Sequence, residues 1–290
     1  MEAQSVLSVG AMLGEGPVWD ARDQALWFVD IKGHRVHRFD PASGDHRSWQ
    51  APGQVGWVLP AAEGGFIAGL QAGVHRFDPA TGAFELLAAP EADRPGNRLN
   101  DATVDADGRI HFGSMDDGEE ALTGRLYCLD RGTVRDSGLA AVCITNGPAI
   151  APDGATLYHT DTLGRVIHAV PLHDDGSLGP ARVFATIAPE DGWPDGCVVD
   201  AEGGLWTGLW GGWRARRYLP DGTIDREVRF PVANITKIAF GGPDRGTAYA
   251  TTARKGLDAT ALAGQPLAGN VFAFDPGVTG APGYQYKGRD

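Results

Sequence analysis

The chain has 290 residues, of which 42% are hydrophobic and 21% charged, a balance typical of a soluble globular protein. Its formal net charge is −12 and no Lys/Arg cluster occurs, so we expect neither nucleic acid nor an anionic membrane surface as a partner. The amino-terminal residues lack the basic segment and apolar core of a secretory signal, and no run of about 18 apolar residues occurs. We therefore expect a cytoplasmic protein that does not span a membrane.

One sequence pattern recurs along the chain: a strand of alternating apolar and polar residues that ends in a polar turn. VHRFDPASG at residues 36–44 returns as VHRFDPATG at residues 74–82, with eight of nine positions identical. Weaker copies begin at Gly124, Arg165 and Asn270. A second series interleaves with the first and has six members: ALWFVD (25–30), GGFIAG (64–69), DGRIHFGS (107–114), DGATLYHTD (153–161), EGGLWTGL (202–209) and DRGTAYATT (244–252).

Most members of the second series open with Asp-Gly or a similar pair, which favours a tight hairpin because the turn needs positive φ. The spacing of roughly 40 to 50 residues fits four short strands with their turns. The sequence therefore predicts an all-β fold, a six-bladed β-propeller with four antiparallel strands per blade, in one domain covering residues 1–290. A strand near Ser5–Val9 would complete the last blade, and a short helical stretch is expected near Leu257–Leu262.

Other all-β architectures fit the repeat less well. A β-helix would need a much shorter period, and the GH…WD signature of WD40 repeats is absent. A large β-sandwich would leave the near-identical segments unexplained. The three cysteines, Cys128, Cys143 and Cys197, contain no CxxC pair, so we expect reduced and mostly buried thiols, without a disulfide framework or zinc knuckle.

The hairpin turns also give a register across the blades. Counting back seven positions from the acidic residue of each turn selects one residue per blade, less regularly in the first: Glu15, Gly56, Asn100, Asn146, Asp195 and Lys237. Short apolar runs follow most of these positions, as expected for buried inner strands. Two Asn, one Asp and one Glu would then meet at one mouth of the central channel.

Oxygen ligands from separate strands suit a hard or borderline divalent cation. One amide and two carboxylates would form a neutral site that leaves positions open for water and substrate. The alternative is that these are ordinary turn residues, since Asn, Asp and Gly favour positive φ. Residues that only form turns would not need to occupy the same position in several blades. The shared register therefore favours the cation site. Lys237 would bind substrate oxygens, repel a metal, or point away from the channel.

Five motifs occur in order between about Leu13 and Asp275: LGEGPVWD, NRLNDATVDADGR, ITNGPAIAPDG, WPDGCVVDAEGGLW and AFGGPD. Together they resemble the gluconolactonase family, also called the senescence marker protein or regucalcin family. The resemblance implies a six-bladed propeller that hydrolyses sugar lactones with one divalent metal cation (Ca²⁺, Zn²⁺, Mn²⁺ or Fe²⁺). It implies metal ligands at Glu15, Asn146 and Asp195, and substrate contacts at Arg98 and Asn100.

The resemblance also implies a substrate contact from a glutamate after the third-blade strand, where Glu119 and Glu120 both fit. The stretches MDDGEE, YHTDTLG, LWGG and TTARKGL most resemble bacterial xylonolactonases, so the expected substrate is a pentonolactone such as xylonolactone. Asp195 is the expected catalytic base, because a ligating carboxylate is held ionised by its cation. The expected assembly is a monomer or a small homo-oligomer.

Several other functions remain to be distinguished. A gluconolactonase or arabinonolactonase would have the same fold, as would a calcium-binding propeller without enzymatic activity or a metal-dependent esterase of phosphotriester-like substrates. A serine hydrolase is not supported, because none of the seven serines lies in a GxSxG motif. Histidine pairs with HxH or HExxH spacing are also absent.

Overall fold

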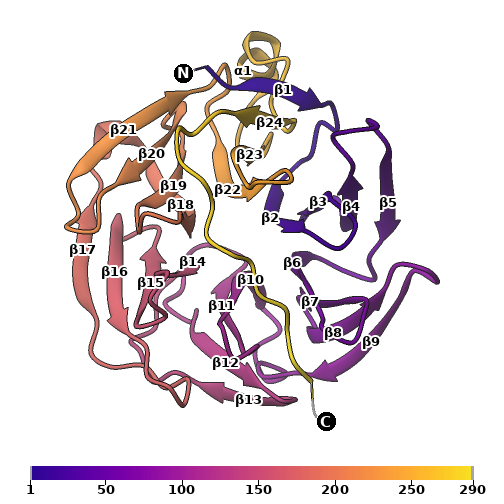
Figure 1. Cartoon of the computed structure of the whole chain (residues 1–290), viewed down its shortest axis with the longest axis vertical. Coiled ribbons are helices and arrows are strands. Elements are labelled where there is room, and N and C mark those ends of the chain that lie inside the picture. Colours follow the sequence, from indigo (N-terminus) through magenta and orange to yellow (C-terminus); the bar gives the residue numbers. More distant parts are fainter. Residues whose placement is uncertain (1, 289–290) are drawn as a thin grey trace.

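The computed structural model describes residues 2–288, and its regular secondary structure consists almost entirely of strands. Within these residues the strands form six sheets of four, arranged as blades around a central axis (Figure 1). Neighbouring strands in a blade are antiparallel, as in the pair formed by β2 and β3 (Gly14–Asp20 and Ala25–Asp30). The predicted six-bladed β-propeller is confirmed.

Each blade runs from an inner strand at the axis to an outer strand. Blade 1 contains β2, β3, β4 (Arg35–Phe39) and β5 (His46–Gln50). Blade 2 contains β6 (Val55–Pro60), β7 (Phe66–Leu70), β8 (Gly73–Asp78) and β9 (Ala83–Ala88). Blade 3 contains β10 (Asn97–Val104), β11 (Ile110–Asp116), β12 (Leu126–Asp130) and β13 (Thr133–Asp136). Blade 4 contains β14 (Thr145–Ile150), β15 (Thr156–Asp161), β16 (Val166–Pro171) and β17 (Arg182–Thr186). Blade 5 contains β18 (Trp193–Val199), β19 (Leu205–Trp210), β20 (Arg214–Tyr218) and β21 (Ile224–Arg229).

Blade 6 closes the ring with strands from both ends of the chain. Its inner strands are β22 (Ile235–Gly241), β23 (Thr247–Thr252) and β24 (Val271–Phe274), and its outer strand is the amino-terminal β1 (Gln4–Leu7). β1 pairs antiparallel with β24, which confirms the predicted closing strand. The short α1 (Ala259–Gly264) lies between β23 and β24, and a 3-10 turn covers Pro189–Asp191.

The turns between the first two strands of each blade have the conformation that their sequences predict. A residue with positive φ occurs in every one of these turns: Gln24 (50°), Gly64 (94°), Gly108 (86°), Gly154 (73°), Gly203 (83°) and Arg245 (57°). Glycine adopts this conformation without a steric cost, whereas Gln24 and Arg245 do not have that freedom. In blades 2 to 6 the N–H of this residue also donates to the carbonyl three positions earlier, so the turn is the same local structure in these five blades. The first blade, where the sequence is least regular, shares only the positive φ.

The hydrophobic core lies between neighbouring blades. Trp27 of blade 1 is buried, stacks on Trp49 at a ring separation of 5.2 Å and contacts Phe66 of blade 2 at 4.1 Å. Such aromatic contacts add to the free energy gained by burying the rings. The three cysteines are buried and free, as predicted. Among residues 2–288 there is no helix long and apolar enough to cross a membrane.

Each inner strand has an irregular register with its neighbour near the position selected by the sequence. The shifts occur at Glu15/Val18, Val55/Trp57, Leu99/Ala102, Asn146/Ala149, Pro194/Cys197 and Ile235/Ile238. The six selected residues lie at or within these shifts. A β-bulge bends the strand and redirects a side chain, which explains why turn-like residues such as Gly, Asn and Asp occur inside strands.

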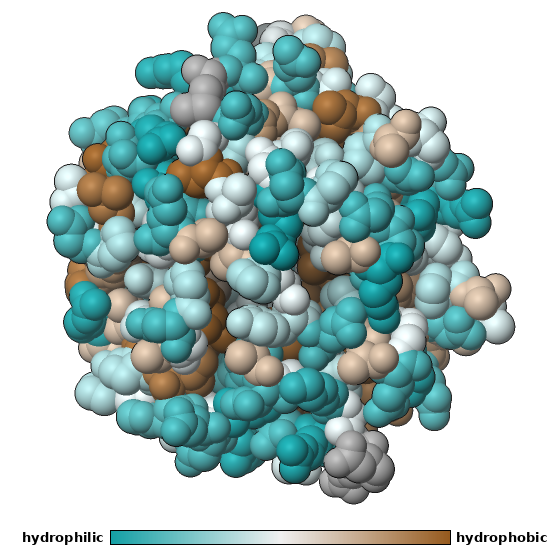
Figure 2. All heavy atoms as spheres, viewed as in Figure 1, coloured by the Kyte–Doolittle hydropathy of each residue, from teal (hydrophilic) through white to brown (hydrophobic). Residues whose placement is uncertain are grey.

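The carboxy-terminal segment crosses one mouth of the ring, in yellow in Figure 1. Its backbone carbonyl at Thr279 accepts from the Ala201 N–H at 2.9 Å, and its Tyr286 N–H donates to the Pro60 carbonyl at 2.9 Å. The segment therefore connects blade 5 with blade 2 across the axis. From this side the surface is mostly hydrophilic, with scattered hydrophobic residues (Figure 2).

Gly56 in β6 is predicted to be essential for the packing of blades 2 and 3. A Cβ atom at Gly56 would lie 2.5 Å from the Leu99 carbonyl oxygen and 2.7 Å from that of Asn100. Because backbone atoms cannot yield as a flexible side chain does, Gly56→Ala should lower the free energy of unfolding by about 2 kcal/mol. The control is Gly53→Ala, where nothing lies within 4 Å of the new Cβ. Equal denaturation midpoints for the two variants would contradict this close approach.

Candidate active site

A cavity of about 290 Å³ lies at the end of the ring where the inner strands begin. Its lining residues are Leu13, Glu15, Arg98, Asn100, Met115, Glu119, Ile144, Asn146, Thr162, Leu163, Trp193, Asp195, Trp210, Lys255 and Gly256. The cavity brings together six of the seven residues for which the sequence predicts a role. The seventh, Glu120, does not line it.

Two buried carboxylates face this cavity. Glu15 and Asp195 are only 4% and 6% exposed, and the Gly16 N–H donates to Glu15 Oε2 at 2.7 Å. Burial and the nearby Asp101 raise the pKa of Glu15 to about 8, although Lys237 and Arg98 act in the opposite direction. Burial and the charge of Glu15 raise the pKa of Asp195 well above its ordinary value. The two carboxylates thus repel each other, and a cation between them would relieve the repulsion.

Asn146 provides an amide oxygen beside the two carboxylates. Its Nδ2 donates to Thr162 Oγ1 at 2.9 Å, and its Oδ1 accepts from Asn100 Nδ2 at 3.0 Å. An amide oxygen has two lone pairs, so Oδ1 retains one for another partner. Carboxylate and amide oxygens are donors that fit a divalent cation. Residues 2–288 contain no group of three or more His, Cys, Asp or Glu side chains that could hold a metal ion, and the oxygen donors at this cavity are two carboxylates and one amide.

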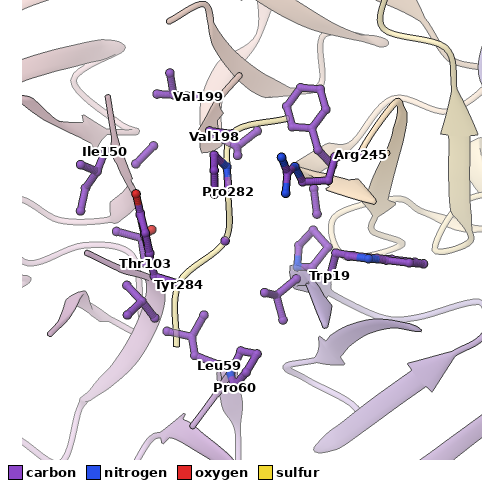
Figure 3. A pocket seen from close by; sticks show the side chains of 18 of the residues that line it. Trp19, Leu59, Pro60, Thr103, Ile150, Val198, Val199, Arg245, Pro282 and Tyr284 are labelled. Atoms are coloured by element: carbon purple, nitrogen blue, oxygen red, sulfur yellow. The ribbon is translucent and has the colours of Figure 1, made fainter. Parts of the chain in front are cut away.

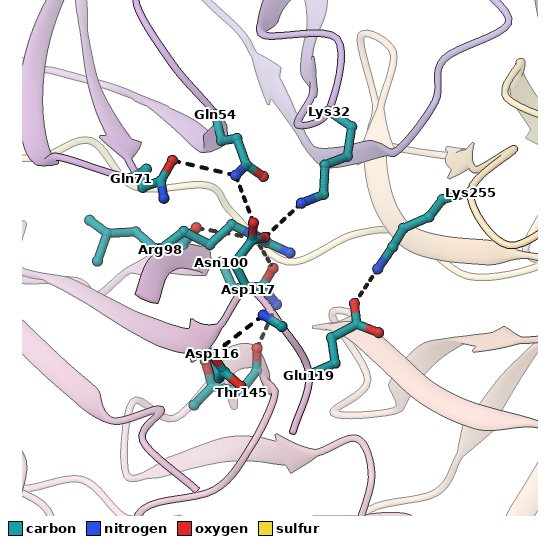
Figure 4. Close-up of polar contacts among 12 residues, drawn as sticks. Lys32, Gln54, Gln71, Arg98, Asn100, Asp116, Asp117, Glu119, Thr145 and Lys255 are labelled. Atoms are coloured by element: carbon teal, nitrogen blue, oxygen red, sulfur yellow. Dashed lines mark hydrogen bonds and ion pairs between the residues drawn. The ribbon is translucent and has the colours of Figure 1, made fainter. Parts of the chain in front are cut away.

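Arg98 and Asn100 form a hydrogen-bonded pair next to this site (Figure 4). Arg98 Nη1 donates to Asn100 Oδ1 at 2.5 Å, and both hydrogens of Asn100 Nδ2 are directed to Asn146 Oδ1 and the Thr145 carbonyl. Arg98 Nε donates to Asp117 Oδ1 at 2.9 Å. The guanidinium and the amide are therefore held in fixed orientations before any ligand binds.

Asp117 anchors this pair through several partners. Lys32 Nζ donates to its Oδ1 at 2.6 Å and Gln54 Nε2 to its Oδ2 at 2.9 Å (Figure 4). Burial alone would raise the pKa of Asp117, but hydrogen bonds from Lys32 and Gln54 and the charge of Arg98 outweigh burial and lower it to about 2. Asp117 is therefore an anion at neutral pH and holds the Arg98 guanidinium in place.

Of the two glutamates that the sequence left open, the structure places only Glu119 on the cavity. Its Oε1 accepts from Lys255 Nζ (Figure 4). The Glu120 side chain is exposed, and its backbone N–H donates to Asp116 Oδ2 at 2.9 Å. Glu119 therefore lines the cavity, whereas Glu120 does not.

Lys237 lies on the other side of the channel, although it occupies the same register position. Its Nζ donates to Asp101 Oδ1 at 2.5 Å. Both residues line a second cavity of about 350 Å³, where the inner strands end. Figure 3 shows this cavity with Trp19, Ile150 and Val198 around it, and Pro282 and Tyr284 of the terminal segment across it. Lys237 therefore lines the channel at the mouth opposite the cavity of Glu15, Asn146 and Asp195, and its ammonium is paired with Asp101.

Sequence reasoning did not identify Asp117, Thr162 and Lys255 as site residues. Each belongs to a loop after a blade's second strand. Asp117 and Lys255 pair with Lys32 and Glu119 of other blades, whereas Thr162 accepts from Asn146 of its own blade. A register count along the inner strands cannot identify such residues. MDDGEE and TTARKGL contain Asp117 and Lys255, but a motif resemblance assigns no partner to either.

The family of proteins that matches this chain is described as the SMP-30/Gluconolactonase/LRE-like region, over residues 13–254. A 6-deoxy-6-sulfogluconolactonase from Pseudomonas putida is 35% identical over 93% of each chain. An L-arabinolactonase from Azospirillum brasilense is 35% identical over 90% of this chain and 87% of its own. The crystal structure of a calcium-binding protein, regucalcin, from Agrobacterium tumefaciens superposes with a TM-score of 0.93. It is 30% identical, and the match covers 99% of this chain and 97% of that one.

The matched region contains the inner strands of all six blades and the residues that line the cavity, apart from Lys255 and Gly256 just beyond it. The family resemblance drawn from the five motifs is thus confirmed by full-length relatives and by the fold. This protein belongs to the SMP-30/gluconolactonase/LRE-like family.

Proposed function

We propose that this protein hydrolyses a sugar lactone to the aldonic acid, with one divalent cation held by Glu15, Asn146 and Asp195. The observation that carries the proposal is the cavity in which two buried carboxylates with raised pKa values and an amide oxygen lie beside a fixed Arg98–Asn100 pair. The relatives named as lactonases, 35% identical over most of the chain, support the same reaction.

A cation bound to these oxygens would polarise the lactone carbonyl and stabilise the negative charge that develops on its oxygen. As water attacks the lactone carbonyl carbon, a carboxylate oxygen of Asp195 accepts a proton from that water. Burial and the charge of Glu15 raise the pKa of Asp195 in the metal-free protein, and a bound cation would hold this carboxylate ionised, so that it can accept a proton. The Asp195 carboxyl then returns the proton to the ring oxygen as the ester bond breaks.

Arg98 and Asn100 are suited to hold the hydroxyl groups of the sugar. Asn100 uses both amide hydrogens within the protein and accepts one bond from Arg98, so its remaining lone pair can accept from a substrate hydroxyl. Within residues 2–288, Arg98 Nη2 has no hydrogen-bond acceptor and can donate to a substrate oxygen. Fixing the lactone in this way removes part of the entropic barrier to attack by water.

The volume of the cavity suits a ligand with a single small sugar ring. Its volume of about 290 Å³ lies at the lower end of ordinary ligand sites. Leu163, Trp193 and Trp210 line it and offer an apolar surface for the C–H face of a sugar. We propose a pentonolactone such as xylonolactone as the substrate, with arabinonolactone and gluconolactone as the nearest alternatives.

The experiment is a measurement of initial acid release from xylono-, arabinono-, glucono- and galactonolactone and from a phosphotriester, with Ca²⁺, Zn²⁺, Mn²⁺ or Fe²⁺ added to chelator-treated protein. We expect the highest kcat/KM for a pentonolactone and turnover only with a cation. Preferred turnover of the phosphotriester would favour the esterase alternative. Cation binding without turnover of any substrate would favour a calcium-binding propeller, as regucalcin from Agrobacterium tumefaciens is described.

A further inference from the structure

An ion pair crosses the entrance of the cavity and joins opposite sides of the ring. Glu119 follows β11 in blade 3 and Lys255 follows β23 in blade 6, and 136 residues separate them in the sequence. Both line the cavity, and Figure 4 shows the ammonium and the carboxylate directed toward each other. Their side chains are 31% and 36% exposed. An ion pair this open to water adds little to the stability of the fold.

The backbone on both sides of this pair is fixed. The Lys255 N–H donates to the Met12 carbonyl at 2.8 Å, and the Lys255 carbonyl accepts from Asn234 Nδ2 at 3.0 Å. Glu119 has a φ of 61°, and its N–H donates to the Asp116 carbonyl at 3.0 Å. A left-handed φ at a residue other than glycine persists only where its surroundings impose it. Only the side chains of Glu119 and Lys255 can still change conformation, and the ion pair between them restricts both.

From this arrangement we infer that Lys255 is a positioning residue for Glu119. This inference rests on the proposed function of the cavity. Lys255 occupies one oxygen of the Glu119 carboxylate, and the other oxygen is left to accept a hydroxyl of the substrate. Without the ammonium, Glu119 is free to turn toward bulk water, since more than a third of its side chain is already exposed. The ion pair therefore selects polyhydroxylated lactones over lactones of the same ring without hydroxyls.

The kinetic test compares Lys255→Met with the wild type on xylono-1,4-lactone and γ-butyrolactone, which has the same ring and no hydroxyl groups. For the sugar lactone we expect KM to rise about tenfold, equivalent to 1.4 kcal/mol, with kcat changed by less than about threefold. For γ-butyrolactone kcat/KM should not change. Lys255→Arg retains the charge and should restore most of the affinity. The matched control is Lys287→Met, an exposed lysine of the terminal segment whose N–H donates to the Gly108 carbonyl at 3.0 Å, in the turn that follows the inner strand of blade 3.

A double-mutant cycle tests whether Lys255 acts through Glu119. Glu119→Gln alone should raise KM as Lys255→Met does, and the double variant should be no worse than either single variant, because the two residues act as one unit. Additive effects, equal losses on both lactones, or a Lys255→Arg variant as defective as Lys255→Met would each overturn the inference.

Binding without turnover separates this inference from the proposed function. The probe is 1,4-anhydroxylitol, a ring polyol without an ester, and its binding is followed by calorimetry. We expect Lys255→Met to bind it about tenfold more weakly than the wild type, whereas equal affinity would overturn the role of Lys255. A wild type that binds the polyol but hydrolyses no lactone would refute the proposed hydrolysis and leave the Lys255 comparison valid. A wild type that hydrolyses xylonolactone but does not bind the polyol would overturn the inference and leave the proposed hydrolysis standing.

Discussion

Asp195→Asn is expected to lower kcat/KM for the sugar lactone by about 10³-fold or more, while the propeller remains folded. Asn has the shape of Asp but does not accept a proton from water, and it brings no negative charge to the cation. The loss therefore combines the missing base with weaker cation binding. The measurement is acid release at saturating cation, so that the loss of the base is seen separately.

The stability of Asp195→Asn provides the control for folding. Burial and Glu15 raise the pKa of Asp195 in the folded protein, so at neutral pH its ionised form opposes folding when no cation is bound. Removing the charge should leave the unfolding midpoint of the metal-free protein unchanged or higher. Asp244→Asn, in an exposed turn at the other face where Oδ1 accepts from the Gly246 N–H at 3.0 Å, should retain full activity. Unchanged turnover by Asp195→Asn would exclude the assigned role.

Glu15→Gln is expected to weaken cation binding by about 100-fold or more. The substitution removes one of the two carboxylates that lie together in the cavity and leaves a neutral amide. Activity should be lost at limiting cation and should largely return at high cation, because Glu15 holds the cation and takes no proton. Calorimetric titration of metal-free protein measures the affinity, and an affinity equal to that of the wild type would show that Glu15 is not a ligand.

The pH dependence of cation binding follows from the same carboxylate. In the metal-free protein the pKa of Glu15 is raised to about 8 by burial and Asp101, so below that pH a proton occupies Glu15 and a cation must displace it. The affinity of the wild type should therefore fall as the pH is lowered from 8 to 6. Glu15→Gln has no such proton to displace and should lose that part of the dependence.

The fold was predictable because its repeat is local. Each blade has a positive φ in its first hairpin turn, and blades 2 to 6 share one hydrogen-bonded turn, even where Arg245 replaces glycine. Each inner strand also places its bulge at nearly the same distance before the turn, so counting along the chain found residues that meet across the ring. The path of the terminal segment across the channel was not predictable, because it depends on backbone hydrogen bonds to Pro60 and Ala201 in distant blades.

The candidate site was predictable where it lies on strands and much less so where it lies on loops. Glu15, Asn146 and Asp195 come from inner strands of three blades and line one cavity. Lys237 has the same register but faces the other mouth, since its ammonium pairs with Asp101. Glu119, but not Glu120, lines the cavity, and its position depends on a left-handed φ in a loop and on Lys255 of blade 6. Neither contact leaves a periodic signal in the sequence.

The most direct test of cation-dependent lactone hydrolysis at this cavity is a titration of activity with metal. Wild-type protein is stripped of metal, and acid release from xylonolactone is measured above the spontaneous rate as a divalent cation is added. The predicted result is no turnover without cation and a linear rise to a plateau at about one equivalent, as one three-ligand site requires. Full activity in the stripped protein, or no turnover with any of the four cations on any of the four lactones, would contradict it.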